Sequence, residues 1–465
     1  MLGDRGPLRY AVAVPIELPP LMRNGRPEPP LAPKRELFGW AMFDFANQAY
    51  TLLIITVIFG DLFTRVIVGP TGLDQDYRLG NLLWSLALAV SYLMVVAAAP
   101  ICGAAMDARR RRKRYLLVSY LATVLCTAAL WWVEPGWVAT AMVLIILSNF
   151  AYALGEAFIA SFLPSLGPRQ ALGWISGFGW ALGYVGGLIA TIFALTLLGE
   201  VSAENYERIR LVGPLAAVFF LLAALPTFIY VREPLSTTLH PTIPLWQRLR
   251  STWHALDQFA DLRRLLTSIF FCMAGLYIII SFAFIYGSQV IGWDESVRIM
   301  MFVIVQITAA VGALVFGVAQ SRLGARRIYL MTLLLWMLAI VMLWQSPNMA
   351  KAAAHWGHAW QAQYIFLIAG CLAGLGLGAS QSAGRALVGM LTPYDKAAEF
   401  FGFWGMTAKL AAVFGLLGIG LLQVWVGLAT AILFCLLLFV VAFWTALGIN
   451  AERGQRQADA WSPVQ

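Results

Sequence analysis

Four ionisable side chains lie inside long apolar stretches of the sequence. Asp44 and Glu156 occur in the first half of the chain, and Arg385 and Lys409 occur in the second. A charge inside a membrane-spanning helix is costly, and proteins that keep one use it to pair with another charge, to carry a proton or to bind a solute. We therefore predict that these four residues carry the function of the chain.

The composition places the stretches that hold these charges in a membrane. Of 465 residues, 60% are hydrophobic and 12% are charged, against about 45–50% and about 25% in soluble proteins. An apolar run of about 20 residues spans a bilayer as a helix. We predict an all-α membrane protein with twelve transmembrane helices, at residues 37–67, 79–106, 115–133, 137–163, 172–198, 211–231, 265–291, 299–319, 328–345, 362–391, 400–423 and 424–448.

The remaining segments define the domain organisation. Residues 1–36 are predicted to be a disordered, Pro-rich arm, residues 37–231 and 265–448 two six-helix bundles, residues 232–264 a linker and residues 449–465 a tail. Most of the 32 Lys and Arg residues fall in the arm, the linker, the tail and alternate loops. This asymmetry predicts that both termini are cytoplasmic. The net charge of +9 therefore reports orientation in the plasma membrane (the inner membrane of a bacterium) and does not indicate nucleic-acid binding.

The linker has a helical pattern of its own. Trp246, Leu249, Trp253, Leu256 and Ala260 are spaced by three and four residues, with arginines on either side. This spacing predicts an amphipathic helix that lies on the inner membrane surface. The alternative is a docking site for another protein.

A short repeat relates the two halves of the chain. Residues 103–116 read GAAMDARRRRKRYL, and residues 317–330 read GVAQSRLGARRIYL. At this constant offset Gly103 matches Gly317, Arg112 matches Arg326, and Lys113 matches Arg327. Two halves repeated in the same orientation are typical of transporters.

The first copy resembles the loop signature of the major facilitator superfamily. Gly103, Asp107 and Arg109 stand at the three places of the signature, and Arg112 and Lys113 belong to the basic run that follows. The second copy has Ser321 where the acid is expected. The resemblance implies a conformational role for Asp107, against the end of a neighbouring helix or an arginine. A basic run beside a membrane also contacts lipid headgroups.

Longer stretches are similar to signatures of one branch, the vacuole-effluxer-like or unknown-major-facilitator family. They are WAMFDFAN at 40–47, FLP at 162–164, SGFGWALGYVGG at 176–187, and Gln381, Ser382, Arg385, Pro393 and EFFGF at 399–403. The likeness runs from about residue 36 to residue 448. It implies a monomeric secondary transporter, and the fungal member of the family exports amino acids from the vacuole.

Two of the four charges are assigned to a gate. The resemblance implies that the first, fourth, seventh and tenth helices line a central cavity, and that the fourth and fifth approach the tenth and eleventh at its cytoplasmic mouth. Glu156 precedes Pro164 by eight residues, and Arg385 precedes Pro393 by eight, so the two occupy equivalent positions in the halves. We predict that Glu156 and Arg385 pair as a cytoplasmic gate while the cavity faces outward.

The other two charges are assigned to the cavity. Asp44 is predicted to bind a proton or the amine of a solute, and Lys409 to hold a solute carboxylate or to neutralise Asp44. Burial raises the pKa of a carboxyl group and a nearby base lowers it, a competition that suits proton coupling. The predicted cavity residues are Asp44, Asn47, Tyr50, Tyr184, Gln381 and Lys409. The alternative is that these charges only pair to hold the bundle together.

The sequence predicts no enzyme, no cofactor and no metal centre. It contains no nucleotide-binding loop and no nucleophile elbow. Its five cysteines are widely spaced in apolar segments, as expected of small buried side chains. His355 and His358 share an expected outer loop but lack further ligands for zinc.

These observations predict a proton-coupled secondary transporter of a small organic solute such as an amino acid. Its predicted partners are the solute, protons and membrane lipids. A passive facilitator and a lipid-headgroup flippase are alternatives. So is a non-transporting receptor or scaffold, in which neutralising Asp44 and Lys409 would change only the stability.

Overall fold

The computed structural model describes residues 22–23, 26–69, 77–199, 201–234, 258–356 and 360–461. Within these ranges the chain is helical apart from loops and the two-residue strands β1 (Met22–Arg23) and β2 (Arg26–Pro27). Twelve helices of the described part are long and apolar enough to cross a membrane. The predicted all-α membrane fold is therefore confirmed.

The first half contains six of these spans. They are α1 (Lys34–Tyr50) with η1 (Thr51–Val57), α2 (Phe59–Leu62) and η2 (Phe63–Ile67); α3 (Arg78–Arg109); α4 (Arg112–Ala128) with η3 (Ala129–Trp132); α5 (Val138–Ala160) with η4 (Leu163–Ser165); η5 (Arg169–Ala171) with α6 (Leu172–Leu198); and α7 (Tyr206–Ile209) with α8 (Val212–Tyr230).

The second half contains the other six and a terminal helix. They are α10 (Ala260–Tyr286) with η6 (Gly287–Ile291); α11 (Glu295–Leu323); α12 (Ala325–His355); α13 (Ala362–Leu391); η7 (Tyr394–Lys396) with α14 (Ala397–Val426); α15 (Leu428–Ala431) with α16 (Leu433–Leu447); and α17 (Ala451–Ala460). Gly324 and Gly427 separate consecutive helices with positive φ angles of 87° and 74°, a conformation that glycine adopts without strain.

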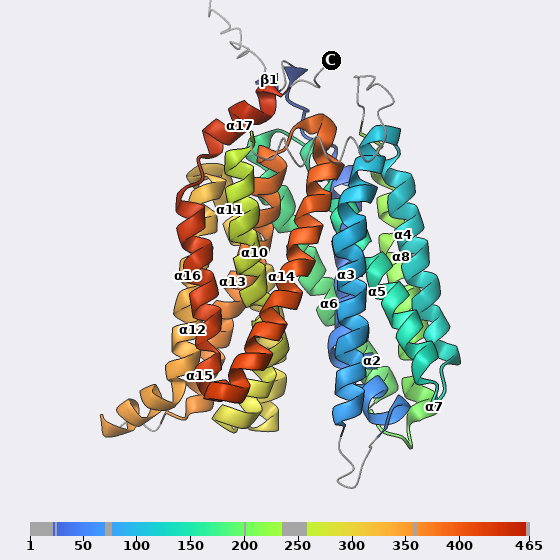
Figure 1. The fold of residues 1–465 in the computed structure, drawn as a ribbon, viewed down its shortest axis with the longest axis vertical. Coiled ribbons are helices and arrows are strands. Elements are labelled where there is room, and N and C mark those ends of the chain that lie inside the picture. The colour runs from blue at the N-terminus through green and yellow to red at the C-terminus, as the bar shows by residue number, and fades with distance from the viewer. Residues whose placement is uncertain are drawn as a thin grey trace, which may run out of the picture.

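The two halves stand side by side, and the long helices of both run roughly along the long axis of the molecule (Figure 1). Helices α3, α4, α5 and α8 lie on the right of this view, and α12, α14 and α16 lie on the left. We call the end that carries β1 and α17 the α17 end, and the opposite end, which carries α7, the α7 end (Figure 1).

Small residues allow the halves to approach closely at the α17 end. Helix α3 packs against α14, and α6 packs against α11. A Cβ atom on Gly103 would clash with the carbonyl oxygen of Ala398, and one on Gly177 would clash with that of Ala313. Glycine at such places lets two helices pack backbone to backbone.

Three segments differ from the predicted boundaries or lie outside the described residues. The arm was predicted to be disordered up to residue 36, but α1 begins at Lys34, directly after Pro33, and the amide of Ala32 donates a hydrogen bond to the carbonyl of Leu166. Helix α12 continues ten residues beyond its predicted end at Gln345, through Pro347 to His355. The amphipathic stripe of the linker lies outside the described residues apart from Ala260, the first residue of α10.

Candidate functional site

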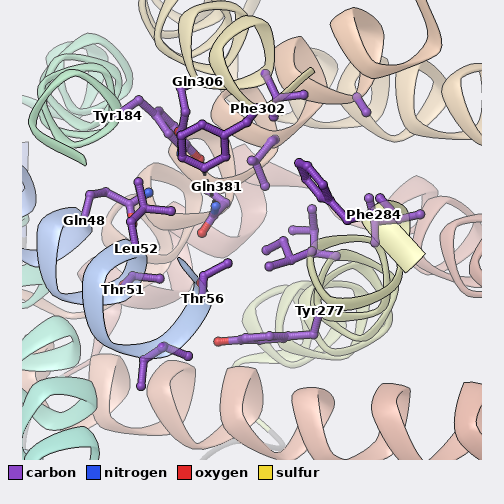
Figure 2. Close-up of a pocket in the computed structure, with 18 of the residues that line it drawn as sticks. Gln48, Thr51, Leu52, Thr56, Tyr184, Tyr277, Phe284, Phe302, Gln306 and Gln381 are labelled. Carbon is purple, nitrogen blue, oxygen red and sulfur yellow. Dashed lines mark hydrogen bonds between the residues drawn. The ribbon is translucent and has the colours of Figure 1, made fainter. Parts of the chain in front are cut away.

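A cavity of about 240 Å³ lies between the two halves. On the side of the first half, Gln48, Thr51 and Thr56 of α1 and η1 line it with amide and hydroxyl groups (Figure 2). On the side of the second half, Tyr277 and Phe284 of α10 line it with aromatic rings (Figure 2). One wall is therefore polar, and the facing wall is mainly aromatic and aliphatic.

The polar wall contains a π-helical segment. The α-helical turns of α1 give way at Thr51 to the seven-residue π-helix η1, in which Thr51, Ile55 and Thr56 line the cavity. The hydroxyls of Thr51 and Tyr152 lie 2.7 Å apart in a hydrogen bond. Beta-branched residues, which make up most of this segment, crowd the turns of a regular helix, and π-helical turns are frequent at functional sites.

The cavity opens toward the α7 end. Helix α10 runs from the α17 end toward the α7 end, and it lines the cavity from Met273 to Phe284. Thr56, Ile280 and Phe284, which lie toward the α7 end, are exposed. Solvent therefore reaches the cavity from this end.

The α17 end is closed by contacts between the halves. The hydroxyl of Ser176 on α6 donates to the carbonyl of Ser382 on α13 over 3.0 Å, and both serines are buried. The carboxylate of Asp107, at the end of α3, accepts a hydrogen bond of 2.9 Å from the backbone amide of Glu399 on α14. A carboxylate near the N-terminus of a helix is favoured by the helix dipole.

The loop signature is organised around Asp107. Arg112 donates to its carboxylate over 2.7 and 3.0 Å and also reaches the carbonyls of Ser161 and Tyr394. The ammonium of Lys113 donates to the carbonyl of Val231, whereas Arg109 is exposed. Gly103 supplies the close contact with α14 described above.

The first ion pair joins Asp44 on α1 to Arg385 on α13. The closest carboxylate and guanidinium atoms are 2.8 Å apart, and Arg385 also donates to the hydroxyl and the carbonyl of Ser176, each over 3.0 Å. The guanidinium carbon lies 4.6 Å from the ring centre of Trp40 and 5.2 Å from that of Trp180. Arg385 is only 2% exposed, so the guanidinium is buried at the closed end, whereas its partner Asp44 lines the cavity.

The second ion pair joins Glu156 on α5 to Lys409 on α14. The ammonium of Lys409 donates to the carboxylate over 3.1 Å and to the hydroxyl of Tyr277 over 2.9 Å. It also lies 5.4 Å from the ring centre of Tyr92 and 5.6 Å from that of Tyr277. The Glu156 side chain is 23% exposed and the Lys409 side chain 6%, so the acid is the more accessible partner.

The ion pairs in the structure differ from those expected from the sequence. Glu156 was expected to pair with Arg385, and Lys409 to hold a solute carboxylate or to neutralise Asp44, but Arg385 binds Asp44 and Lys409 binds Glu156. The reason is helix packing, because α13 packs against α6, next to α1, whereas α5 packs against α14. Equivalent positions of the two halves therefore face different neighbours.

Most other predicted cavity residues line the cavity. Asn47, Tyr184 and Gln381 do so, and the amide of Gln381 donates to the hydroxyl of Tyr184 over 3.1 Å. Asn47 Oδ1 is buried without a hydrogen-bond partner in the described structure. Tyr50 instead lies behind the wall, where its hydroxyl bonds that of Ser148 over 2.8 Å and its ring stacks on Tyr152.

Sequence reasoning missed two features of the site. Tyr92 and Tyr277 surround the Lys409 ammonium, and the available signal was a tyrosine within each of two apolar spans. At the α17 end, Arg169 donates two hydrogen bonds, of 2.6 and 2.8 Å, to Asp459 on α17. The polar tail carries no pattern that would point to this partner.

Comparison with known proteins agrees with this architecture. The family model described as vacuole effluxer Atg22 like matches residues 83–459. The uncharacterized MFS-type transporter YxiO of Bacillus subtilis is 24% identical over 412 residues, which cover 87% of this chain and 92% of that protein. Autophagy-related protein 22 of Kluyveromyces lactis is 23% identical over 300 residues, 61% of this chain and 59% of that protein.

Solved structures show the same fold. The MFS transporter FucP, in the outward conformation, aligns with a TM-score of 0.69 at 14% identity, over 89% of this chain and 98% of that chain. The human organic anion transporter MFSD10 aligns with a TM-score of 0.66 at 15% identity, over 89% and 99%. The molecule thus has the major facilitator fold of integral multi-pass transporters, and the chain belongs to the vacuole effluxer Atg22-like family of that superfamily.

Proposed function

We propose that this transporter moves a small organic solute, such as an amino acid, together with protons, by alternating access. The observation that carries the proposal is a cavity between the halves that contains ionisable groups, is reached from the α7 end and is closed at the α17 end. Transporters of this architecture work by rocking one half against the other around a central site. The cavity supplies such a site.

The α17 end is proposed to be cytoplasmic, in the plasma membrane or the inner membrane of a bacterium. The support is the concentration of Lys and Arg in the segments of this end, including Arg109, Arg112 and Lys113. In this orientation the structure is outward-facing. The resemblance to the family also implies a monomer in contact with lipids.

The cytoplasmic gate is proposed to be the pair Asp44–Arg385, with Asp107 against α14 as a second closing contact. Arg385 belongs to the second half, and its partners Asp44 and Ser176 belong to the first. Rocking to an inward-facing state must therefore break these contacts. Of the two residues that the sequence assigned to the gate, only Arg385 is proposed to act there, and Glu156 is proposed to act in the cavity.

The test is solute-driven proton flux into proteoliposomes that contain a pH-sensitive dye. The vesicles are challenged with amino acids and small organic acids, with Asp44→Asn beside the wild type. We expect proton movement with one class of solute and its loss, by tenfold or more, in Asp44→Asn, because the gate then lacks its carboxylate.

The alternatives give other results in vesicles that hold folded protein. Solute equilibration that a pH gradient does not drive would indicate a passive facilitator. Absence of flux with every solute, together with scrambling of labelled lipids, would indicate a flippase. Absence of both activities would favour the receptor or scaffold.

A further inference from the structure

We propose that the Glu156–Lys409 pair is the coupling site, at which a carboxylate of the solute replaces Glu156 on Lys409 and Glu156 takes up a proton. This inference rests on the proposed function and names its solute class and its proton carrier. The solute is a carboxylate with an apolar or aromatic body.

Lys409 is the cation that a solute meets in this cavity. Among the described residues that line the cavity, the charged ones are Asp44, Glu156 and Lys409. Arg385 lies beyond Asp44, between the rings of Trp40 and Trp180. An anionic group that enters from the α7 end is therefore attracted to Lys409.

Lys409 makes two hydrogen bonds within the described structure and has one donor left for a second anion. An ammonium group has three donors, and two of them are used by Glu156 and by the Tyr277 hydroxyl. The third donor allows a solute carboxylate to bind before Glu156 leaves. This order matters because a buried ammonium that loses its only counter-charge is strongly destabilised.

Glu156 is placed to exchange a proton once it is released. It is more exposed to the cavity than its partner, and a protonated carboxyl costs less to bury than a carboxylate. Among the described residues, five ionisable groups, on α1, α3, α5, α6 and α14, interact electrostatically with Glu156, and a sixth, on α10, lies beside Lys409. In this order of helices they are Asp44, Tyr92, Tyr152, Tyr184, Lys409 and Tyr277. Lys409 is the cation of this set, so a Glu156 carboxylate released from Lys409 has no counter-charge among these groups.

The exchange balances in charge and in hydrogen bonds. The bond from Lys409 to Glu156 breaks, a bond from Lys409 to the solute carboxylate forms, and Glu156 accepts one proton from the outer solution, relayed by water in the cavity. With a monoanionic solute the pair and its ligand carry no net charge before or after the exchange, so one proton crosses with each carboxylate. Met273, Leu276 and Phe284, which line the cavity on the same helix as Tyr277, would cover the apolar body of the solute.

The test compares acids with amides of the same shape. Proteoliposomes are given 3-phenylpropanoate or 3-phenylpropanamide, and L-phenylalanine or L-phenylalaninamide, while solute and proton entry are both recorded. After entry into protein-free vesicles is subtracted, we expect each acid to enter with about one proton, and each amide to enter at least tenfold more slowly. Tenfold corresponds to about 1.4 kcal/mol.

Variants separate the two roles of the pair. Glu156→Gln should retain counterflow of 3-phenylpropanoate and lose proton movement. Lys409→Met should lose counterflow by tenfold or more, and Lys409→Arg, which keeps the charge, should retain a measurable part of it. Glu295→Gln and Lys351→Met, at exposed positions outside the cavity lining, should behave like the wild type. Size-exclusion profiles check that each variant is folded. If Lys409→Met does not fold, the counterflow that Lys409→Arg retains tests whether a cation at this position binds the solute.

The outcomes distinguish this inference from the proposed function. If the amides enter as fast as the acids, or if Glu156→Gln still moves protons with the solute, the carboxylate exchange is wrong although transport is established. If amines or sugars enter and no carboxylate does, the inference fails in the same way. If no solute of any class enters vesicles with folded protein, the proposed function itself fails.

Discussion

Arg385 divides its hydrogen bonds between two helices of the opposite half. Its guanidinium binds the carboxylate of Asp44 on α1 and two oxygens of Ser176 on α6, beside the rings of Trp40 and Trp180. A buried charge is tolerated only while its partners remain in place. The pair therefore stabilises the state in which the α17 end is closed, and this stabilisation is lost when the halves separate there.

Removing one partner of the Asp44–Arg385 pair should lower the free energy of unfolding more than removing both partners. Arg385→Ala leaves the Asp44 carboxylate buried without its counter-charge, so we expect a loss of about 3–5 kcal/mol in the free energy of unfolding. Asp44→Asn/Arg385→Gln removes both charges and should recover much of this loss. Denaturant titration in detergent micelles measures the effect, with the exposed Arg208→Ala as the control. A double variant no more stable than Arg385→Ala would contradict the assignment.

The presence of four charged residues inside the membrane spans could be predicted from the sequence, but the partner of each could not. Charged residues inside apolar runs are visible in one sequence because they interrupt the hydrophobic pattern. Which acid meets which base depends on how α13 and α14 rotate and pack against the first half. The symmetry of the repeat favoured Glu156 for Arg385, whereas the packing of α13 against α6, which itself packs against α1, brought Arg385 to Asp44.

Helix α17 connects the two halves across the closed end. Arg453 of α17 donates twice, over 2.7 Å each, to Asp261 at the start of α10, and Asp459 of α17 binds Arg169 in the loop between α5 and α6. The hydrogen bonds to Asp261, and then the negative charge of that residue, raise the pKa of Arg453 above its usual value. Arg453 therefore keeps its charge at any working pH, and its contact with α10 should weaken only in acid that protonates the carboxylate of Asp261.

Breaking the contact between α17 and the first half should loosen the closed end. We expect Arg169→Ala to increase, several-fold, the rate at which a maleimide labels Ser382→Cys in a background without the native cysteines. Ser382 is fully buried at this end in the closed state, so its labelling reports opening. Asp459→Ala should have the same effect, and the two changes together should add little, because they remove the same interaction. Arg208→Ala is the control, and an unchanged labelling rate in Arg169→Ala would contradict the role of α17.

Most helices were predictable as elements because apolar runs of membrane length have no other stable structure in a bilayer. Two of the departures lie where the polar ends contact protein. The tail forms α17 because it pairs with Asp261 and Arg169, and Pro33 starts α1 earlier than the hydrophobic pattern suggests. No hydropathy pattern records such contacts.

The whole molecule is asymmetric although its halves are related by a repeat. The cavity reaches the α7 end, whereas the α17 end is sealed by Asp107, Ser176 and Arg385. If the halves rock as rigid bodies, the ion pair Asp44–Arg385 must open once in each transport cycle. The pair Glu156–Lys409, which also joins the halves, faces the solute before that opening.

A cross-link that holds the α17 end closed tests this account most directly. The hydrogen bond of 3.0 Å from the Ser176 hydroxyl to the Ser382 carbonyl joins α6 to α13 at this end, and a disulfide between cysteines at these two positions would hold the halves together. Ser176→Cys/Ser382→Cys, in a background without the native cysteines, is reconstituted and assayed for solute-driven proton flux after oxidation and again after reduction, beside each single variant. The account predicts that oxidation stops the flux in the double variant alone and that reduction restores it. Full flux through molecules shown to be cross-linked would contradict alternating access at this end.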